Sequence, residues 1–397
     1  MNLIDRITQF HADMRDIRRD IHAHPELCYQ EARTSDVVAQ KLTEWGIPVV
    51  RGLGKTGLVG TIKAGTSKRS IGLRADMDAL PLQEHNTFAH CSTNAGKMHA
   101  CGHDGHTTML LAAAKYLSES RNFDGTVNVI FQPAEEGGAG AAAMIADGLF
   151  EKFPCDAVFG MHNWPGSKVG TFGVVAGPMM ASSNEFEITI TGKGAHAAMP
   201  HNGVDPVMVA VSIAQNLQTL ISRNKRPIDT AVLSITQIHA GDAYNIIPNE
   251  AVLRGTVRTF STEVLDLIES GMARIVEYSA KALGAGAHLR FKRNYPPTVN
   301  HKKETEFAIG VMQDVVGKDN VQTAIDPTMG SEDFAFMLEE LPGCYFFIGN
   351  GDGGHREHGH GIGPCMLHNP SYDFNDELIP IGATVWVRMA EKFLAPA

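Results

Sequence analysis

The sequence predicts an α/β protein whose mixed, mostly parallel sheet is covered by helices on both faces and carries an inserted α+β domain of ferredoxin-like type. The chain has 397 residues, more than a single hydrophobic core usually accommodates, so two domains are expected. Strand and helix signals alternate in the first part of the chain, which is typical of parallel pairing. Between residues 181 and 294 the order changes to βαββαβ, the ferredoxin-like arrangement.

The larger domain is expected to comprise residues 1–180 and 295–397. Apolar residues recur every three or four positions from Ile4 to Ile21, the period of an amphipathic helix. Polar residues follow several predicted strands, and in parallel sheets functional groups gather at the carboxyl ends of strands. The pattern predicts further helices at 33–45, 107–118, 139–147 and from about 376, and strands at 57–63, 70–76, 126–131 and 157–162.

The inserted domain begins with clean alternation of apolar and polar residues over 184–192, which predicts a strand with one solvated face. An exposed edge of its sheet makes a homo-oligomer through this domain a candidate. The remaining predicted elements are a helix at 206–221, strands at 230–238 and 251–259, a helix at 262–283 and a strand at 288–295.

Composition and charge exclude several classes of partner. A net charge of −10 argues against nucleic acid, which needs a basic face. No apolar run reaches the roughly 20 residues of a membrane helix, and the N-terminus does not resemble a signal peptide. Six scattered cysteines do not make a disulfide scaffold, so reduced thiols or metal ligands are expected. We therefore expect a cytoplasmic protein with neither nucleic acid nor membrane as partner.

The sharpest chemical signal is Lys97-Met-His-Ala-Cys-Gly-His-Asp-Gly-His106. Cys101 and His103 are two residues apart, so in an extended segment both side chains project to the same side. A thiolate and an imidazole facing one way suit a transition metal. A histidine-rich loop without metal is the alternative.

A pair of carboxylates, Glu135 and Glu136, follows a predicted buried strand. Buried carboxylates are costly unless they serve a purpose. Adjacent side chains point in different directions, so one can ligate a metal while its neighbour reaches a water as general base. An exposed acidic turn is the alternative.

Two further histidines, His162 and His368, sit among turn residues, and each alone is typical of a hydrogen-bonded structural histidine. Together with Cys101, His103 and one glutamate they supply enough donors for two metals if one ligand bridges. Asp76 and Asp78, directly after a strand, are candidates to orient a ligating histidine.

Other candidate residues carry weaker signals. In the insert, His196 lies in a glycine-rich turn and Asn245 in a loop, while Arg258 at a strand end could clamp a carboxylate or form a surface ion pair. Ser331 is a candidate helix N-cap near an anion site. The histidines of residues 353–360 favour a polar loop over a metal site.

The chain resembles the amidohydrolase and metallopeptidase family of hippurate hydrolase, bacterial N-acyl-amino-acid amidohydrolases and plant auxin–amino-acid conjugate hydrolases. The resemblance covers nearly the whole chain, from His22 to Pro370. It rests on the combination Ala75-Asp-Met-Asp-Ala-Leu-Pro81, Cys101-Gly-His-Asp104, Gln132-Pro-Ala-Glu-Glu136, Gly194-Ala-His196 and Gly330-Ser-Glu-Asp333. Related enzymes outside this branch carry an aspartate where Cys101 stands.

The resemblance implies a catalytic di-metal domain and an inserted lid or dimerisation domain. It implies that Cys101 bridges two divalent metal ions (Zn, Mn, Ni or Co) and that Glu135 is the general base. His196 would stabilise the tetrahedral intermediate, and Asn245 and Arg258 would bind the substrate. The implied remaining metal ligands are His103, Glu136, His162 and His368.

The implied activity is metal-dependent hydrolysis of the amide bond of a small-molecule N-acyl-L-amino acid, with hippurate-like or N-acetyl-amino-acid substrates. A dipeptidase, a carboxypeptidase or an N-acetyl-diaminopimelate deacetylase on the same scaffold is an alternative. A metal-binding protein without turnover is a more remote one.

Overall fold

The computed structural model describes residues 1–356 and 358–396, and it divides into two compact units. The first unit comprises Met1–Met179, Val299–Asp326 and Asp333–Ala397. The second comprises Met180–Thr298 and Pro327–Glu332, slightly more than the predicted insert.

The first unit is built on one eight-stranded mixed sheet of order β1-β2-β4-β3-β5-β16-β6-β15. Its centre is parallel, because β3 pairs in parallel with β4 and β5, and β5 with β16. Strands β3 and β16 are buried at every residue, as expected of strands covered on both faces. The strands are β1 (Val49–Leu53), β2 (Gly57–Ala64), β3 (Ser70–Asp76), β4 (Gly125–Gln132), β5 (Ala157–Pro165), β6 (Phe172–Gly173), β15 (Val321–Gln322) and β16 (Gly343–Gly351).

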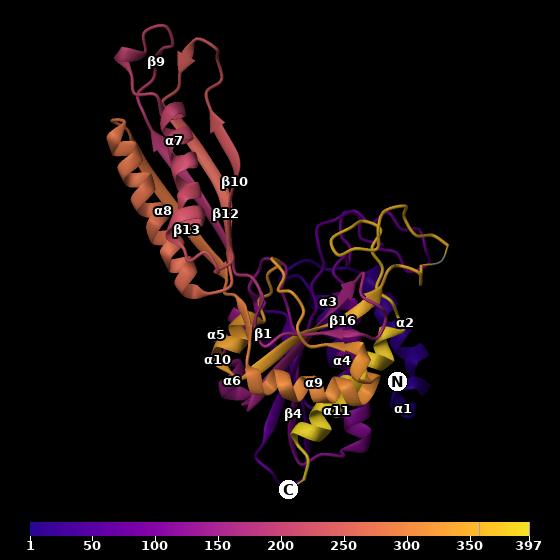
Figure 1. Cartoon of the computed structure of the whole chain (residues 1–397). Helices are drawn as coiled ribbons and strands as arrows, with labels where there is room; N and C mark the ends of the chain where they lie inside the picture. The colour runs from indigo at the N-terminus through magenta and orange to yellow at the C-terminus, as the bar shows by residue number, and fades with distance from the viewer. Residues whose placement is uncertain (357, 397) are drawn as a thin grey trace. The chain divides into compact units, whose positions relative to one another are not determined.

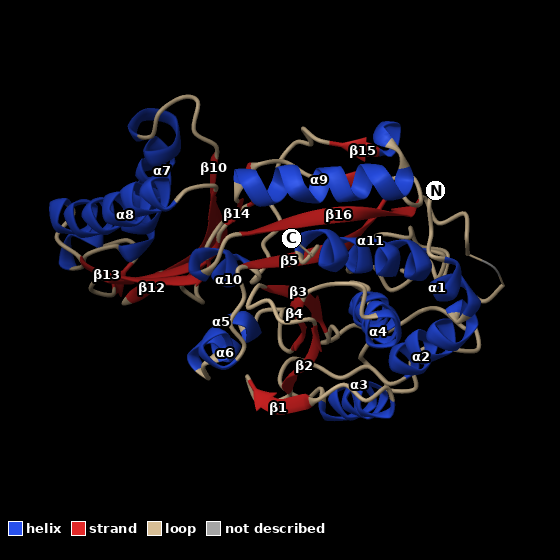
Figure 2. Ribbon diagram, turned by 90° about the horizontal axis from the view of Figure 1, so that it is seen from below, coloured by secondary structure: helices blue, strands red, loops and turns tan. Residues whose placement is uncertain are grey.

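Helices cover both faces of this sheet, as predicted (Figure 2). One face carries α3 (Ala32–Glu44), α4 (His103–Ser120), α9 (Lys302–Val316) and α11 (Leu378–Phe393), whose apolar residues join one core with the strands. The other face carries α5 (Gly140–Ala146), α6 (Leu149–Lys152) and α10 (Ala335–Glu340). The remaining short elements are η3 (Lys318–Asn320), β7 (Gly177–Met180) and β14 (Thr298–Asn300).

The N-terminal amphipathic stretch forms two helices where one was expected. Helix α1 (Asp5–Gln9) and helix α2 (His11–Ala23) meet at Phe10, whose φ of −102° and ψ of 16° are not helical. The helical hydrogen bonding is interrupted at Phe10, yet each of the two helices still has a buried side, with Ile7 in α1 and Met14 in α2. Apolar periodicity alone cannot show such a break, because the spacing of buried residues continues through it.

The second unit is an antiparallel sheet of order β10-β12-β8-β13 with two helices packed on one face, the predicted ferredoxin-like arrangement (Figure 1). Asp205 caps helix α7 and Ser261 caps helix α8 through side-chain hydrogen bonds. Helix α7 gives way to a π-helical turn (Leu220–Asn224), so it ends earlier than predicted. The main elements are β8 (Ser183–Thr191), α7 (Pro206–Thr219), β10 (Ala231–Ala240), β12 (Glu250–Thr259), α8 (Thr262–Ala282) and β13 (Gly286–Tyr295), with short β9 (Ala195–His196), η1 (Pro200–Asn202) and β11 (Ile246–Ile247).

None of the helices in the described residues is both long and apolar enough to span a bilayer. The six cysteines are all free thiols, four of them buried.

Candidate metal centre

The candidate ligands of the first unit converge at the carboxyl edge of its parallel strands. Asp76 ends β3, Gln132 ends β4, and His162 lies in the second half of β5. The same edge receives the turn that holds Glu135 and the segment that precedes α4. Open parallel sheets place their reactive groups at this edge.

Cys101 and His103 come together, but not in the extended segment that was predicted. Gly102 adopts a left-handed conformation with φ of +86°, and His103 is already the first residue of α4. The extended prediction is wrong because the glycine turns the chain directly into the helix. The thiol and the imidazole nevertheless belong to one group of donors.

Cys101 is shared by two groups of donor atoms that could each hold a metal ion. One group is Cys101, His103 and His162, and the other is Cys101, Glu136 and His368, with all ligand atoms in each group within 4.8 Å of one another. The Cys101 Sγ lies 3.3 Å from Nε2 of His162, and Nε2 of His368 lies 3.2 Å from Oε1 of Glu136. A single sulfur common to two donor groups is the arrangement that a bridging ligand requires.

Hydrogen bonds at Nδ1 fix which ring nitrogen of His162 and of His103 faces the site. His162 Nδ1 lies 2.6 Å from the carbonyl oxygen of Asn163, so it donates there and leaves Nε2 with a lone pair toward Cys101. His103 Nδ1 lies 3.2 Å from Oδ1 of Asp78. Its buried Nε2 has no hydrogen-bond partner in the described residues. Outer hydrogen bonds of this kind orient metal-binding imidazoles.

The carboxylates of the site shift the pKa values of their neighbours. Burial, then Glu136 and Glu135, raise the pKa of the Cys101 thiol well above its ordinary value. Burial alone would lower the pKa of His103, but Asp76 and Asp78 outweigh it and raise the value to about 10. Burial, then the neighbouring His106, lower the pKa of His162 well below its ordinary range, so this imidazole is neutral.

These features fit divalent cations. The buried carboxylates keep a proton on His103 and on the Cys101 thiol, so the site attracts positive charge. Metal ligands must shed such protons, and cations of charge two replace them. One thiolate, three imidazoles and a carboxylate are soft and borderline donors, which suits zinc, cobalt or nickel.

One candidate ligand and one residue close to the candidate base hold strained backbone conformations. His368 has φ of +60° and Ala134, just before Glu135, has φ of +56°; neither is glycine. The His368 N–H donates to the carbonyl oxygen of Ala100 at 2.8 Å, and the Ala134 N–H donates to Glu31 at 2.9 Å. Strain of this kind persists only where surrounding contacts impose it, and it is common at functional sites.

Comparison with known proteins places this arrangement in a family. The model of Peptidase family M20/M25/M40 matches residues 72–392. The chain belongs to this family. The prediction of a metal-dependent amidohydrolase with two metal ions is thereby confirmed.

Individual relatives match over most of their length. The chain is 43% identical to a hippurate hydrolase of Campylobacter jejuni over 394 residues, which cover 99% of this chain and 100% of the relative. It is 41% identical over 345 residues to an N-acetyl-L-cysteine deacetylase of Bacillus subtilis, covering 86% of this chain and 81% of that one. A solved Bacillus subtilis structure, described as a dinuclear metal binding peptidase from the M20 family, superimposes with a TM-score of 0.83 at 34% identity, covering 98% and 99%.

In the second unit of this M20 protein, two of the three predicted substrate-contacting residues are neighbours. His196 on β9 pairs with Ile246 on β11, and the N–H of Ala197 donates to the carbonyl oxygen of Asn245 at 3.0 Å. Arg258 lies near the far end of β12, whose first residue, Glu250, follows shortly after the segment that contains Asn245 and β11. The eight residues from Glu250 to Arg258 span about 26 Å at the rise of an extended strand. Within this unit, Arg258 therefore lies apart from the other two, and its guanidinium donates to Thr256.

The sequence analysis missed a hydrogen-bond network behind the ligands. His106 lies 2.6 Å from Asp76 through Nδ1, and its Nε2 accepts from the backbone N–H of Asn163 at 2.9 Å. The Asn163 side chain donates to the carbonyl oxygen of Cys101 at 2.7 Å and accepts from the Tyr372 hydroxyl at 2.8 Å. His106 stands in the quoted motif, so its position beside Cys101 was the available signal.

Two weaker expectations have different outcomes. Ser331 does not cap a helix, because the helix that follows, α10, begins at Ala335 with Phe334 as its N-cap. Asp333 and Phe334 form a turn before the helix, so the helix start lies beyond the serine. His360 and His355 lie 3.0 and 3.9 Å from Asp373 and join none of the candidate metal groups. Residue 357 of that loop lies outside the described residues.

Proposed function

We propose that this M20 protein hydrolyses the amide bond of N-acyl-L-amino acids, giving a carboxylic acid and a free amino acid. The observation that carries the proposal is the Cys101 sulfur shared by two donor groups, with Glu135 beside them. The names of the hippurate hydrolase and the N-acetyl-L-cysteine deacetylase support the substrate class.

Five side chains would hold the two cations. Cys101 would bridge them, and the others are His103, Glu136, His162 and His368. Bound there, divalent cations lower the pKa of water and polarise a substrate carbonyl. Asp78 would keep the His103 ring in place through its 3.2 Å contact with Nδ1, while Asp76 lies 3.9 Å from the Nε2 of the same ring.

Glu135 would act as the general base. Its backbone N–H donates to Asp78 at 3.0 Å, the residue is 6% exposed, and its carboxylate lies in one donor group with His103 and Glu136. The carboxylate takes a proton from the attacking water and returns it to the leaving nitrogen of the amide. The adjacent Glu136 has a different task, because its side chain belongs to the group with Cys101 and His368.

His196 is suited to donate a hydrogen bond to the oxyanion of the tetrahedral intermediate. Its Nδ1 accepts from the backbone N–H of Ala198 at 3.1 Å. The ring proton of the neutral imidazole is therefore on Nε2, which makes this exposed atom a donor. Asn245, its neighbour, would contact the substrate beside it. Arg258 lies apart from both residues within this unit, so its part in substrate binding stays a prediction from the sequence. Cytoplasmic location and assembly through the second unit stay predictions from the sequence.

The test is a substrate panel run with defined metals. Purified protein is stripped with chelator, reloaded with zinc, manganese, cobalt or nickel, and offered N-benzoylglycine, N-acetyl amino acids, free dipeptides and N-acetyl-diaminopimelate. We expect hydrolysis of the acylated amino acids, loss of activity on chelation and recovery on reloading. Cleavage of free dipeptides alone, or of N-acetyl-diaminopimelate alone, would assign one of the alternatives. Metal binding without hydrolysis under any metal would indicate a non-catalytic protein.

A further inference from the structure

A second concave site lies in the first unit, away from the candidate metal centre. It is a pocket of about 680 Å³, within the size range of small-molecule sites. Its floor is the start of β3 and β4 and the end of β2, and its wall includes the segment before β5. The metal ligands gather at the other, carboxyl ends of β3, β4 and β5, so the pocket occupies the opposite edge of the same sheet.

The floor of this pocket is polar where a sheet covered by protein would be apolar. Thr61 on β2 is paired with Asn128 on β4, and Lys63 with Thr126, so these four side chains share one face. Earlier on the same face, the positions are apolar and fully buried, as at Val59. The change from apolar to polar along one face marks where the covering elements end and the pocket begins.

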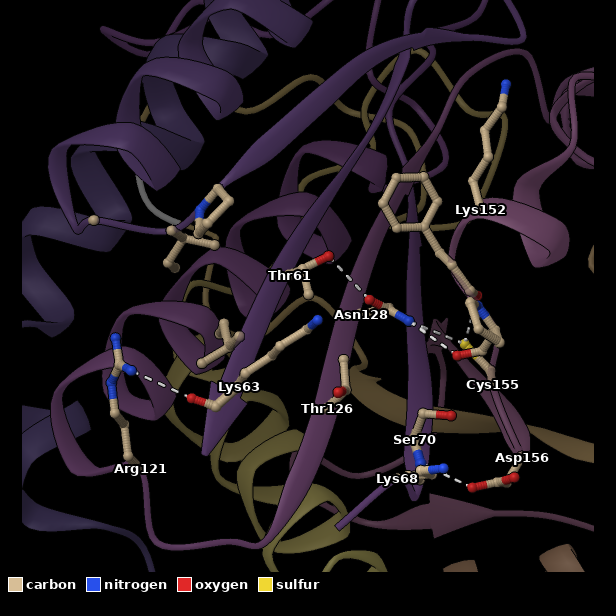
Figure 3. Close-up of a pocket in the computed structure, with 16 residues that line it drawn as sticks. Thr61, Lys63, Lys68, Ser70, Arg121, Thr126, Asn128, Lys152, Cys155 and Asp156 are labelled. Carbon is tan, nitrogen blue, oxygen red and sulfur yellow. Dashed lines mark hydrogen bonds between the residues drawn. The ribbon is translucent and has the colours of Figure 1, made fainter. Parts of the chain in front are cut away.

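The polar floor is already ordered. The Thr61 hydroxyl donates to Oδ1 of Asn128 at 3.0 Å, and the Asn128 amide donates to the carbonyl oxygen of Pro154 at 3.3 Å (Figure 3). Asn128 is 2% exposed. A ligand entering the pocket therefore meets fixed dipoles and does not have to order them.

Positive charge dominates the rim, in a protein whose net charge is −10. The lining includes four cations and one carboxylate, Asp156, which accepts from the backbone N–H of Ser70 at 2.8 Å. Lys63 reaches across the strands toward Asn128, whereas Lys152 points away and donates to the carbonyl oxygen of Asp147 (Figure 3). The cations are Lys63, Lys68, Arg121 and Lys152.

Two of the cations are available to a ligand. Among the residues that the structure describes, neither Lys63 nor Lys68 has an ion-pair partner within 4 Å. Arg121 is held in place, since its guanidinium donates to the carbonyl oxygens of Lys63 and Ser118. Apolar groups of Pro48 and Phe153 complete the walls. Such a lining complements an anionic head joined to an apolar body.

We propose that this pocket binds a small organic anion, with a carboxylate or phosphate facing Lys63 and Lys68 and an apolar group against Pro48 and Phe153. The concave shape favours a small molecule over a macromolecular polyanion, which would need an extended basic surface. The site is separate from the amide-hydrolysing centre, and the inference does not depend on the proposed reaction.

The experiment titrates the metal-loaded protein with benzoate, phenyl phosphate, inorganic phosphate and uncharged benzyl alcohol by calorimetry. Lys63→Glu and Lys68→Glu are compared with Lys318→Glu, an exposed lysine outside the pocket that undergoes the same change of charge. We expect an aromatic anion to bind and each pocket variant to weaken it about tenfold, while Lys318→Glu changes it less than about twofold. Anion binding at the metal centre is common to all variants, so the difference reports on the pocket.

The two headgroups distinguish the sources of the ligand. Binding of benzoate alone assigns a carboxylate, and binding of phenyl phosphate alone assigns a phosphate. If inorganic phosphate binds more weakly than phenyl phosphate, the apolar part of the ligand contributes to affinity. Acetylation of lysines followed by mass spectrometry gives an independent readout, because the bound anion should protect Lys63 and Lys68 but not Lys318. Binding that is unchanged in Lys63→Glu and Lys68→Glu, or no binding of either aromatic anion up to ~10 mM, would overturn the proposal.

Discussion

Asp78 accepts a hydrogen bond from Nδ1 of His103 at 3.2 Å, and the same carboxylate accepts the backbone N–H groups of Glu135 and Glu136 at 3.0 and 2.9 Å. One buried side chain thus ties the first residue of α4 to the turn after β4. A candidate ligand on one segment and the candidate base on another take their positions from this single carboxylate.

Replacing Asp78 with asparagine should therefore weaken metal binding. The amide keeps the size of the side chain but loses the charge that orients the His103 ring, and loss of such an outer partner typically costs about 10–100-fold in metal affinity or activity. Zinc or manganese titration of the chelated protein measures the effect. Asp16→Asn, at an exposed position on α2, is the matched control and should bind metal like the wild type. Equal affinity in Asp78→Asn would show that the ring needs no such support.

The two adjacent glutamates should respond differently to the same change. Glu135→Gln is expected to keep both metal ions and to lower kcat by about 10²–10⁴-fold, the usual contribution of a general base. Glu136→Gln is expected to lose metal, because its carboxylate lies in the donor group with Cys101 and His368. Elemental analysis and hydrolysis of N-benzoylglycine give the two readouts. The assignment of the base is wrong if Glu135→Gln turns over at near wild-type rate.

The sequence reveals the buried parallel strands because they are nearly continuous apolar runs. It also reveals the ferredoxin-like insert, whose strands alternate and whose helices α7 and α8 carry capping residues. It misses β16, an equally apolar run that lies after the insert and pairs with β5 only in the folded chain. The pairing joins residues so far apart in the chain that no local pattern predicts it.

The site follows the same division. The donor residues stand in short motifs, so their chemical types are visible in the sequence. The residues that support these donors are not visible in the same way. Arg74, for example, is fully buried between Asp76 and Asp333, with ion pairs at 2.7 and 3.1 Å. An arginine within a predicted strand shows nothing of a carboxylate 259 residues away. The sequence therefore predicts the residue types of the site but not the long-range contacts that hold them in place.

A buried ion network near the start of α4 predicts how stability depends on pH. His22 is fully buried, with Nδ1 2.9 Å from Asp104 and Nε2 3.3 Å from Glu84. Burial alone would lower its pKa, but Asp104 and Glu84 outweigh it and raise the value from 6.5 to about 9. The protonated ring therefore stabilises the fold by about 3 kcal/mol, since one pKa unit corresponds to about 1.4 kcal/mol.

This contribution is fully present below pH 6.5 and is lost as the pH rises from 6.5 to about 9. Denaturant unfolding of the chelated protein across that window should show the decline, and His22→Gln should make it shallower, leaving the part that the raised pKa of His103 contributes. His24→Gln, a partly exposed histidine at the end of the same helix, should keep the wild-type slope. If His22→Gln also keeps that slope, the ring is not charged in the folded protein.

Gly102 offers a test of the turn that brings Cys101 and His103 together. Its φ of +86° disfavours any side chain, and a Cβ there would lie 2.4 Å from the Asn163 amide and from the Tyr372 hydroxyl. Gly102→Ala should lower the free energy of unfolding by about 2–5 kcal/mol, from left-handed strain and overpacking together.

The clash falls on the network that supports the ligands, so Gly102→Ala should also lose metal affinity. Gly310→Ala is the matched control: it lies inside α9, and a Cβ there meets nothing within 4 Å. Alanine at that position should stabilise the protein by up to ~1 kcal/mol, because it favours the helix. Denaturant unfolding with and without zinc measures both variants. If Gly102→Ala binds metal as the wild type does, the approach of Cys101 and His103 does not depend on the left-handed turn, and the loop must reach the same geometry by another route.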